Sequence, residues 1–292
     1  MEVIRGWTHS AFAVDEPSGV GEARRHAAQL ALRAGFDELH AGRLALVVTE
    51  LGTNLARHAR GGQLLIAARP HALDVEVLSI DRGPGMVDIA RSMEDGHSSG
   101  STPGTGLGAV RRLSDEFELH STPAGTVCLA RVRHAADPVR ENTLPRPGEA
   151  RFRIGAVCLP APGESVCGDA WSAVIDGPAA RLLLADGLGH GPEAHAASTA
   201  ATACFERDAF AGLADLVRQI HVELQTTRGA AVCVAAIDAE RAELGYCGAG
   251  NIAGRVVSGV FDKSLLTQHG TAGMQIRRPE PATIELPPHG LV

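Results

Sequence analysis

The sequence is poor in aromatic residues and in lysine. The first shortage excludes an aromatic core, and the second is part of a charge balance that argues against some classes of partner. Aromatic residues make up 3% of the 292 residues, so the core must be built from Leu, Val, Ile and Ala. Lys263 is the only lysine, and 27 basic against 34 acidic residues leave a net charge of −7. This balance argues against a protein that coats nucleic acid or an anionic membrane. We therefore expect neither nucleic acid nor a membrane as a partner.

Paired cysteines and long apolar runs are also missing. None of the six cysteines forms a C-x-x-C pair, which excludes zinc-ribbon and thioredoxin-like motifs. The sequence shows no basic-then-apolar leader and no apolar stretch long enough to span a bilayer. These absences predict a reduced, cytoplasmic protein. The remaining composition, 45% hydrophobic and 21% charged, is typical of a globular chain.

A proline-rich segment divides the chain. Residues 134–150 contain three prolines and mixed charges without apolar periodicity, which is the composition of a linker. We expect one domain over residues 1–133 and another over residues 151–292. The length of the chain agrees with two domains.

Apolar spacing predicts the elements of each half. In the first half we expect helices over about residues 18–34, capped by Ser18, and 38–59, and strands over 63–68, 73–80 and 126–133. In the second half we expect a helix over 192–208 and strands over 152–159, 171–176, 180–185, 230–237, 242–247 and 252–258. Helices and strands mix without a βαβ rhythm, which indicates the α+β class. The first half reads as an α/β sandwich and the second as a β-sandwich flanked by helices.

The helix predicted over residues 38–59 carries polar residues that could hold a nucleotide. Glu50, Asn54 and His58 follow one another at i, i+4 spacing, so they share one face. The side-chain oxygen of Asn54 suits a hard cation such as magnesium. Glu50 could accept a proton or orient a hydroxyl. The same spacing also fits a solvated polar stripe.

Two glycine-rich segments follow. Asp81 ends a predicted strand and precedes Gly83 and Gly85, which let a ligand approach the backbone, and its carboxylate can accept a hydrogen bond from an exocyclic amine. Residues 104–108, Gly-Thr-Gly-Leu-Gly, stand before a predicted helix and can form an anion site from backbone N–H groups. Each segment alone also fits an ordinary turn. Rossmann and P-loop motifs are excluded, because G-x-G-x-x-G and a Gly-Lys-Ser/Thr end are both missing here.

Together the three motifs resemble the GHKL ATPases, and most of all the anti-sigma-factor and switch-protein serine kinases of bacterial stress signalling. The resemblance covers about residues 10–133 and implies a Bergerat-type α/β sandwich that binds ATP with Mg²⁺. It implies that Asn54 binds magnesium, that Asp81 reads the adenine amine and that Glu50 is the proton acceptor. It assigns the base pocket and the phosphate lid to Gly83, Gly85, Gly104, Gly106 and Gly108. Kinases of this group phosphorylate a serine or threonine of a small STAS-domain antagonist protein.

Two Asp-Gly segments in the second half could hold a divalent metal. Asp169 follows Gly168, and Asp186 ends a predicted strand before Gly187. Magnesium requires oxygen ligands at roughly 2.0–2.1 Å in near-octahedral geometry, which carboxylates on rigid, glycine-flanked strand ends can supply. Two such ions would activate a water for attack on a phosphate ester. Both segments also fit ordinary turns of a β-rich domain.

Four short segments resemble the SpoIIE-type serine/threonine phosphatases, which use paired manganese or magnesium ions. They are Gly-Asp-Ala-Trp at 168–171, Ala-Asp-Gly-Leu-Gly-His-Gly at 185–191, Thr-Arg-Gly-Ala-Ala-Val at 227–232 and Gly-Ala-Gly-Asn-Ile at 248–252. The resemblance implies that Asp169, Asp186 and Gly187 bind the metal, and that Arg228 and Asn251 are structural or near the substrate. The family has a further Ser/Thr-Asp-Gly segment after Leu-Pro-Pro, where this sequence ends. We therefore expect either a phosphatase domain that is cut short at its C-terminus in this sequence or a metal site that lacks one carboxylate.

The sequence thus predicts a bacterial signalling enzyme that binds ATP and sets the phosphorylation state of a STAS-domain anti-sigma antagonist or switch protein. Its first domain is kinase-like and its second is a protein serine/threonine phosphatase that uses Mn²⁺ or Mg²⁺. The prediction leaves room for a homodimer. Two alternatives stay open. One is a non-catalytic, ATP-dependent regulator that sequesters a partner, and the other is a phosphatase gated by an ATP-sensing domain.

Overall fold

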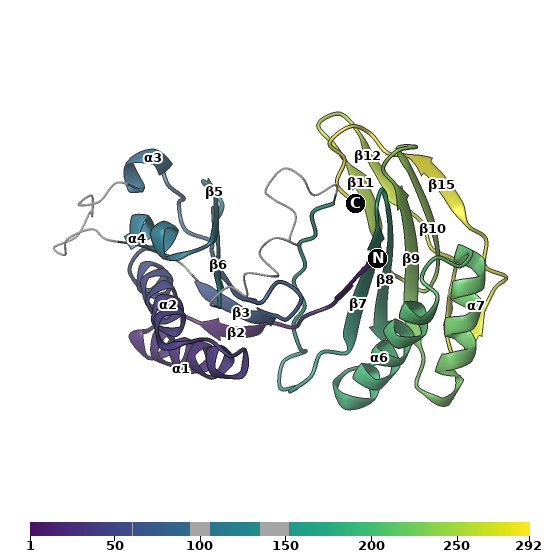
Figure 1. Ribbon diagram of the computed structural model, residues 1–292, viewed down its shortest axis with the longest axis horizontal. Coiled ribbons are helices and arrows are strands. Elements are labelled where there is room, and N and C mark those ends of the chain that lie inside the picture. Colours follow the sequence, from purple (N-terminus) through teal and green to yellow (C-terminus); the bar gives the residue numbers. More distant parts are fainter. Residues whose placement is uncertain (60, 94–105, 135–151) are drawn as a thin grey trace. The chain divides into compact units, whose positions relative to one another are not determined.

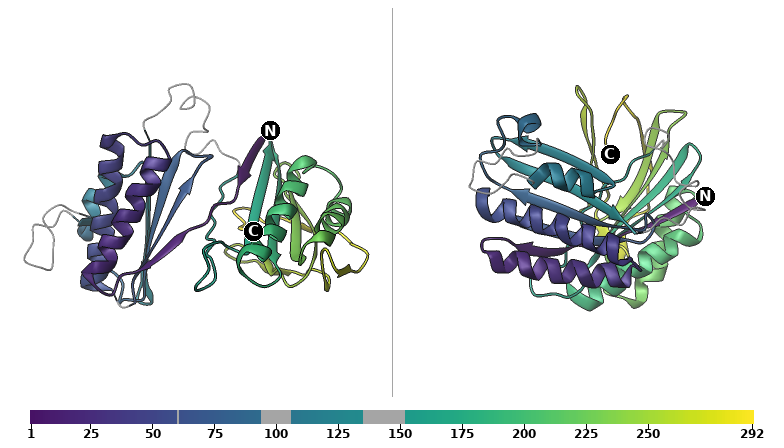
Figure 2. Two further views of the ribbon diagram at one scale, coloured as in Figure 1. Left: turned by 90° about the horizontal axis from the view of Figure 1, so that it is seen from below. Right: turned by 60° about the vertical axis from the view of Figure 1, so that its left-hand side comes forward.

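The computed structural model describes residues 1–59, 61–93, 106–134 and 152–292 (Figure 1). The chain forms two compact units, Thr8–Leu144 and Pro145–Val292, the second of which also includes Met1–Trp7. We call them the 8–144 unit and the 145–292 unit. Each has one large antiparallel sheet with helices packed on it (Figure 2), which confirms the predicted α+β class. Among the described residues, no helix is both long and apolar enough to cross a membrane.

Five strands form the sheet of the 8–144 unit, in the order β2-β3-β4-β6-β5. Their bounds are Ser10–Ala13 (β2), Gln63–Arg69 (β3), Asp74–Asp81 (β4), Glu116–Thr122 (β5) and Gly125–Arg133 (β6). Side chains alternate between the two faces of a strand, so Val75 and Val77 enter the helix-covered core while Glu76 lies on the other face. By the same alternation, Asp81 at the end of β4 lies on the helix side.

Helices cover one face of this sheet (Figure 2). They are α1 (Pro17–Arg33), α2 (Glu38–His58) and α4 (Gly106–Leu113), and a short α3 (Ile89–Ser92) follows β4. Asp37 caps α2, because its Oδ1 accepts a hydrogen bond from the His40 backbone N–H at 2.8 Å. The prediction that Ser18 caps α1 is wrong. The helix begins at Pro17, whose fixed φ suits the first helical position and whose missing N–H needs no cap.

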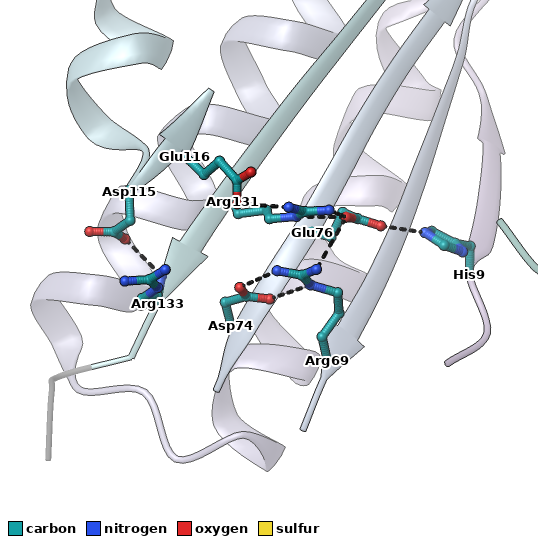
Figure 3. Close-up of polar contacts among 8 residues, drawn as sticks. All are labelled: His9, Arg69, Asp74, Glu76, Asp115, Glu116, Arg131 and Arg133. Atoms are coloured by element: carbon teal, nitrogen blue, oxygen red, sulfur yellow. Dashed lines mark hydrogen bonds and ion pairs between the residues drawn. The ribbon is translucent and has the colours of Figure 1, made fainter. Parts of the chain in front are cut away.

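The opposite face carries a buried network of charged side chains (Figure 3). Glu76, whose side chain is 2% exposed, is at its centre. One carboxylate oxygen lies 3.0 Å from His9 Nε2, and the other accepts from Arg131 Nε at 2.7 Å. Burial alone would raise the pKa of Glu76, but the His9 hydrogen bond and the Arg131 charge hold that pKa below its ordinary value. Beside them, Arg69 donates two hydrogen bonds to Asp74, at 2.8 and 2.6 Å.

Six strands form the sheet of the 145–292 unit, in the order β1-β7-β8-β9-β10-β15. Their bounds are Glu2–Arg5 (β1), Asp169–Asp176 (β7), Ala179–Gly187 (β8), Ala230–Asp238 (β9), Glu243–Ala249 (β10) and Ala282–Glu285 (β15). One face packs against α6 (Gly191–Arg207) and α7 (Leu213–Glu223), which is followed by the 3₁₀ turn η1 (Leu224–Thr226).

Two short strand pairs complete the 145–292 unit. They are β11 (Gly254–Val257) with β12 (Asp262–Leu265), and β13 (Gly270–Thr271) with β14 (Gln275–Ile276). A core cluster that contains Tyr246, Val256 and Leu265 packs the β11–β12 pair onto the sheet face away from the helices. This second layer gives the unit its sandwich character.

The strand β1 belongs to the second sheet, although the sequence places residues 1–133 in one domain. It pairs antiparallel with Ser172–Ile175 of β7. The physical reason is local packing, because Ile4 is buried there. Trp7 also packs edge-on against Trp171, with ring centroids 4.7 Å apart.

Residues 152–159, predicted as a strand, form neither strand nor helix. Their side chains alternate between partly buried and exposed from residue 152 to residue 157, as those of a strand would. The alternation misleads because a strand also needs a neighbour for its backbone hydrogen bonds, and no described strand pairs with this segment.

We predict that Glu76→Gln destabilises the 8–144 unit by about 3–5 kcal/mol, because it removes the more deeply buried of the two carboxylates that pair with the Arg131 guanidinium. Glu116→Gln is the matched control. Glu116 also accepts from Arg131, at 2.7 Å, but its side chain is 30% exposed, so a loss below about 1 kcal/mol is expected. Denaturant unfolding of both variants measures the difference. Equal losses would contradict the central place of Glu76.

Candidate functional site

The first and third nucleotide motifs meet at α2. Asn54 is partly buried and lies one helical turn after Glu50. Gly106, the first residue of α4, lies against it: a β-carbon at Gly106 would be 3.6 Å from Asn54 Oδ1 and 3.7 Å from Nδ2. Arg43 ties α4 to α2, since its Nε donates to the Leu113 carbonyl at 2.9 Å. The amide of Asn54 therefore lies beside the start of α4.

The second motif reaches the same end of α2. Asp81 Oδ1 accepts from the Gly83 backbone N–H at 2.6 Å. Gly83 is buried, and a β-carbon there would lie 3.4 Å from the His58 carbonyl oxygen. Gly85 has φ +72, and a β-carbon there would be 2.1 Å from the Thr122 carbonyl oxygen, so only glycine fits. All three motifs thus converge on the C-terminal half of α2.

The start of α4 is the third part of this candidate site. Gly106 and Gly108 lie in its first turn, and Gly108 is buried. The predicted lid residue Gly104 lies outside the described residues. Backbone N–H groups at a helix N-terminus attract anions, while an amide oxygen suits a hard cation and a carboxylate accepts from an amine. These are the groups that a magnesium–nucleotide complex requires.

In the 145–292 unit, β7 and β8 place Asp169 directly opposite Asp186. Both side chains lie on the sheet face away from α6, because Leu183 and Ala185 fill the helix-side core. Partial burial, together with the neighbouring Asp186 carboxylate, raises the pKa of Asp169. Like charges directly opposite destabilise a strand pair, and a bound cation would relieve them.

Gly187 holds the two Asp-Gly segments together. Its backbone N–H donates to the Gly168 carbonyl at 3.2 Å. A β-carbon at Gly187 would lie 2.1 Å from the Ala194 carbonyl oxygen of α6. The end of β8 can therefore approach α6 only because position 187 has no side chain.

A cavity of about 460 Å³ opens beside Asp186. Asn251 lines it too, so the second and fourth phosphatase-like segments reach the same place. Thr267 and His269 also line the cavity, and sequence reasoning missed both because they belong to no recognised motif. Arg228 is not part of this lining, but it lies next to the lining residue Gly189, where a β-carbon would be 3.4 Å from Arg228 Nη1, and it forms an ion pair with Glu193 near the start of α6.

The candidate metal donors in the 145–292 unit are two carboxylates, Asp169 and Asp186. Within the described ranges, no group of three or more His, Cys, Asp and Glu side chains is placed to hold a metal ion. His190 and His195 each use Nδ1 on a protein oxygen, the first at 2.5 Å from Glu164 and the second at 2.9 Å from the Cys167 carbonyl. Asp169 and Asp186 fit an ion whose remaining ligands are backbone carbonyls and water.

Residues 13–132 match the family of histidine kinase-like ATPase domains. The chain is similar to the serine/threonine-protein kinase RsbT of Bacillus subtilis strain 168, with 36% identity over 101 residues. This match covers 34% of the chain and 76% of RsbT. The family match includes every candidate residue of the nucleotide site.

Solved structures are similar to parts of the chain. A chain from a structure of the bacterial stressosome is 29% identical, over 44% of this chain and 67% of its own length, with a TM-score of 0.42. RsbX in complex with magnesium is 24% identical, over 44% and 66%, with a TM-score of 0.42. The PP2C phosphatase domain of SpoIIE from Bacillus subtilis, solved with a fragment of its regulatory domain, is 14% identical over 93% and 78%, with a TM-score of 0.41. At these scores the likenesses assign no role to any residue.

We predict that Gly187→Ala destabilises the 145–292 unit by about 1–3 kcal/mol, because the added methyl group forces the end of β8 away from α6. Gly155→Ala is the matched control, since a β-carbon there meets nothing within 4 Å. Its effect should stay within about 0.5 kcal/mol. Calorimetric unfolding distinguishes the two variants. Identical unfolding transitions of the two variants would show that α6 moves to admit the added methyl group without a loss of stability.

Proposed function

The chain belongs, through residues 13–132, to the histidine kinase-like ATPase family, and we propose that it is a two-domain enzyme of partner-switching signalling in bacteria. In this proposal the first domain binds ATP and phosphorylates a serine or threonine of a STAS-domain partner. The second domain, residues 151–292, removes a phosphoryl group from the same kind of residue. Residues 134–150 link the two. The observation that carries the proposal is the meeting of three nucleotide motifs at one end of α2.

Each group at the nucleotide site has a proposed task. The Asn54 amide oxygen would hold the Mg²⁺ that accompanies ATP, and the N-terminus of α4 would face the phosphates. Asp81 would accept a hydrogen bond from the adenine amine, with Gly83 and Gly85 leaving room for the base. Glu50, one turn from Asn54, would accept the proton of the attacking hydroxyl.

The phosphatase half of the proposal rests on the paired carboxylates and the cavity beside them. Asp169 and Asp186 would hold Mn²⁺ or Mg²⁺, with Gly187 keeping their supporting strand end against α6. A bound divalent ion supplies a Lewis acid and an activated water for phosphate-ester hydrolysis. The cavity lined by Asp186 and Asn251 would receive the phosphorylated segment of the partner.

We predict that Asn54→Ala abolishes or strongly weakens Mg–ATP binding, whereas Glu50→Gln keeps binding but lowers phosphoryl transfer roughly 10²–10⁴-fold. Leu46→Ala on the same helix, 52% exposed, is a control that should change neither. Calorimetry measures binding, and labelled ATP with STAS proteins from the same genome measures transfer. Unchanged binding by Asn54→Ala would exclude the nucleotide site. ATP binding without transfer by the wild type would favour a non-catalytic or gating domain.

We predict that Asp186→Asn lowers metal-dependent hydrolysis of a phosphoserine partner by more than the roughly 10–100-fold that loss of an outer-shell group costs. Asp176→Asn is the matched control, because this exposed carboxylate lies at the far end of β7. The assay uses the full chain, with manganese varied. Equal hydrolysis by wild type and Asp186→Asn would remove Asp186 from the site.

A further inference from the structure

Two of the six cysteines lie in contact. All six are buried thiols. The sulfur atoms of Cys158 and Cys167 are 3.1 Å apart, and the residues are 8% and 3% exposed. Cys233 and Cys247 offer a contrast. They lie on neighbouring strands, but Cys233 is opposite Gly248 and Cys247 is opposite Val234, so alternation sends their side chains to opposite faces.

The contact closes a loop that leads into β7. Residues 159–166 form no strand or helix, and Cys167 stands two residues before Asp169. Cys158 Sγ lies 3.7 Å from the Asp169 carbonyl oxygen, and Cys167 Sγ lies 3.1 Å from the Leu159 carbonyl oxygen. The thiol pair therefore lies against the first residue of β7.

The same loop is attached to the segment that follows β8. Glu164, in the middle of the loop, lies 2.5 Å from His190 Nδ1. A β-carbon at Gly191, the first residue of α6, would lie 2.6 Å from the Glu164 carboxylate. On the other side, the Cys167 carbonyl accepts from His195 of α6. A movement of the loop would thus also move the start of β7 and the segment after β8, the two strands that carry the paired aspartates.

We propose that Cys158 and Cys167 are a reversible dithiol–disulfide pair that is oxidised by a peroxide. One thiol displaces water from hydrogen peroxide and becomes a sulfenic acid, and the second thiol then displaces a second water to form the S–S bond. In sum, two thiols and one peroxide give one disulfide and two waters, with two electrons passing to the peroxide. In a reducing compartment such a bond is transient, as redox-sensing disulfides are.

Oxidation displaces the start of β7. The sulfur atoms must approach by about 1 Å to reach the S–S length of ~2.04 Å. Cys167 is joined to Asp169 through Gly168 alone, so this movement shifts the Asp169 carboxylate relative to Asp186. The disulfide itself is independent of the proposed phosphatase. Its effect on metal binding rests on that proposal, because Asp169 and Asp186 form the proposed site.

Mass spectrometry of the full chain tests the disulfide. After treatment with one equivalent of hydrogen peroxide, we expect a cross-linked peptide that joins Cys158 to Cys167 and full alkylation of Cys128, Cys204, Cys233 and Cys247. Dithiothreitol should restore six alkylatable thiols. Oxidation spread over all six cysteines, or sulfinic acid at Cys158 or Cys167 without a cross-link, would overturn the proposal. Wild-type protein suffices, so the result does not depend on whether a variant folds.

Hydrogen–deuterium exchange tests the effect on β7 without any metal. The disulfide form should exchange at least about threefold more slowly over residues 159–170, because the closed loop opens less often. Cys158→Ala should not respond to peroxide, whereas the control Cys204→Ala should respond as the wild type does. Unchanged exchange in the cross-linked wild type would overturn the coupling to β7.

Manganese calorimetry tests the link to the metal site. We expect the oxidised chain to bind Mn²⁺ at least about threefold more weakly than the reduced chain, because a displaced carboxylate no longer fits the ion. Equal affinities would overturn the regulatory part of the inference. If the reduced chain binds no Mn²⁺, the proposed metal site fails, while cross-linking and exchange still decide the disulfide.

Discussion

Two like charges set directly across a strand pair constrain the whole 145–292 unit. Asp169 and Asp186 face each other because β7 and β8 form a hairpin through the two-residue turn Gly177–Pro178, with Gly177 at φ +55. That register leaves the carboxylates on one face, where partial burial and mutual repulsion raise the pKa of Asp169. A strand pair keeps such an arrangement only if something offsets the repulsion. The unfavourable pair is therefore the strongest physical reason to place a cation here.

The 8–144 unit has a different requirement, because its proposed ligand is an anion and the backbone must be open enough for that anion to approach it. Its site depends on missing side chains: Gly83 and Gly106 lie against α2, and Gly85 lies against Thr122. A site built from close backbone approaches needs a stiff sheet behind it. The network around Glu76 supplies this on the far face, where the carboxylates of Asp74 and Glu76 pair with the guanidinium groups of Arg69 and Arg131 (Figure 3). The site on the helix side of the sheet thus depends on glycines that leave room for a ligand, whereas the other face depends on ion pairs between buried side chains.

Sequence alone predicts those parts of the molecule that repeat or that carry motif residues. The apolar stripe from Leu44 to Leu55 predicts α2, and the motif residues Asp169 and Asp186 prove to be register partners. Sequence alone does not predict contacts between residues that are far apart in the chain. The charges of Asp74 and Glu76 alternate with valines as on a solvent-facing strand, yet they are buried, because their partners come from β3, β6 and His9. Four residues such as Glu2–Arg5 carry too little pattern to reveal which sheet they join.

The place of β1 makes the chain pass from one unit to the other twice, once after Trp7 and once after Leu144. This strand precedes the ATPase-like domain in the sequence, yet it covers the edge of β7, whose first residue is Asp169. Ser172 of β7 donates to Glu206 of α6 and reaches the Ile4 carbonyl at 3.4 Å. A fragment that began after the linker would expose the hydrogen-bonding edge of β7 and would lose the packing of Trp7 on Trp171. The edge of the strand that carries the proposed phosphatase carboxylate Asp169 is thus covered by residues from the other end of the sequence, so the 145–292 unit needs Met1–Trp7 to keep that edge paired.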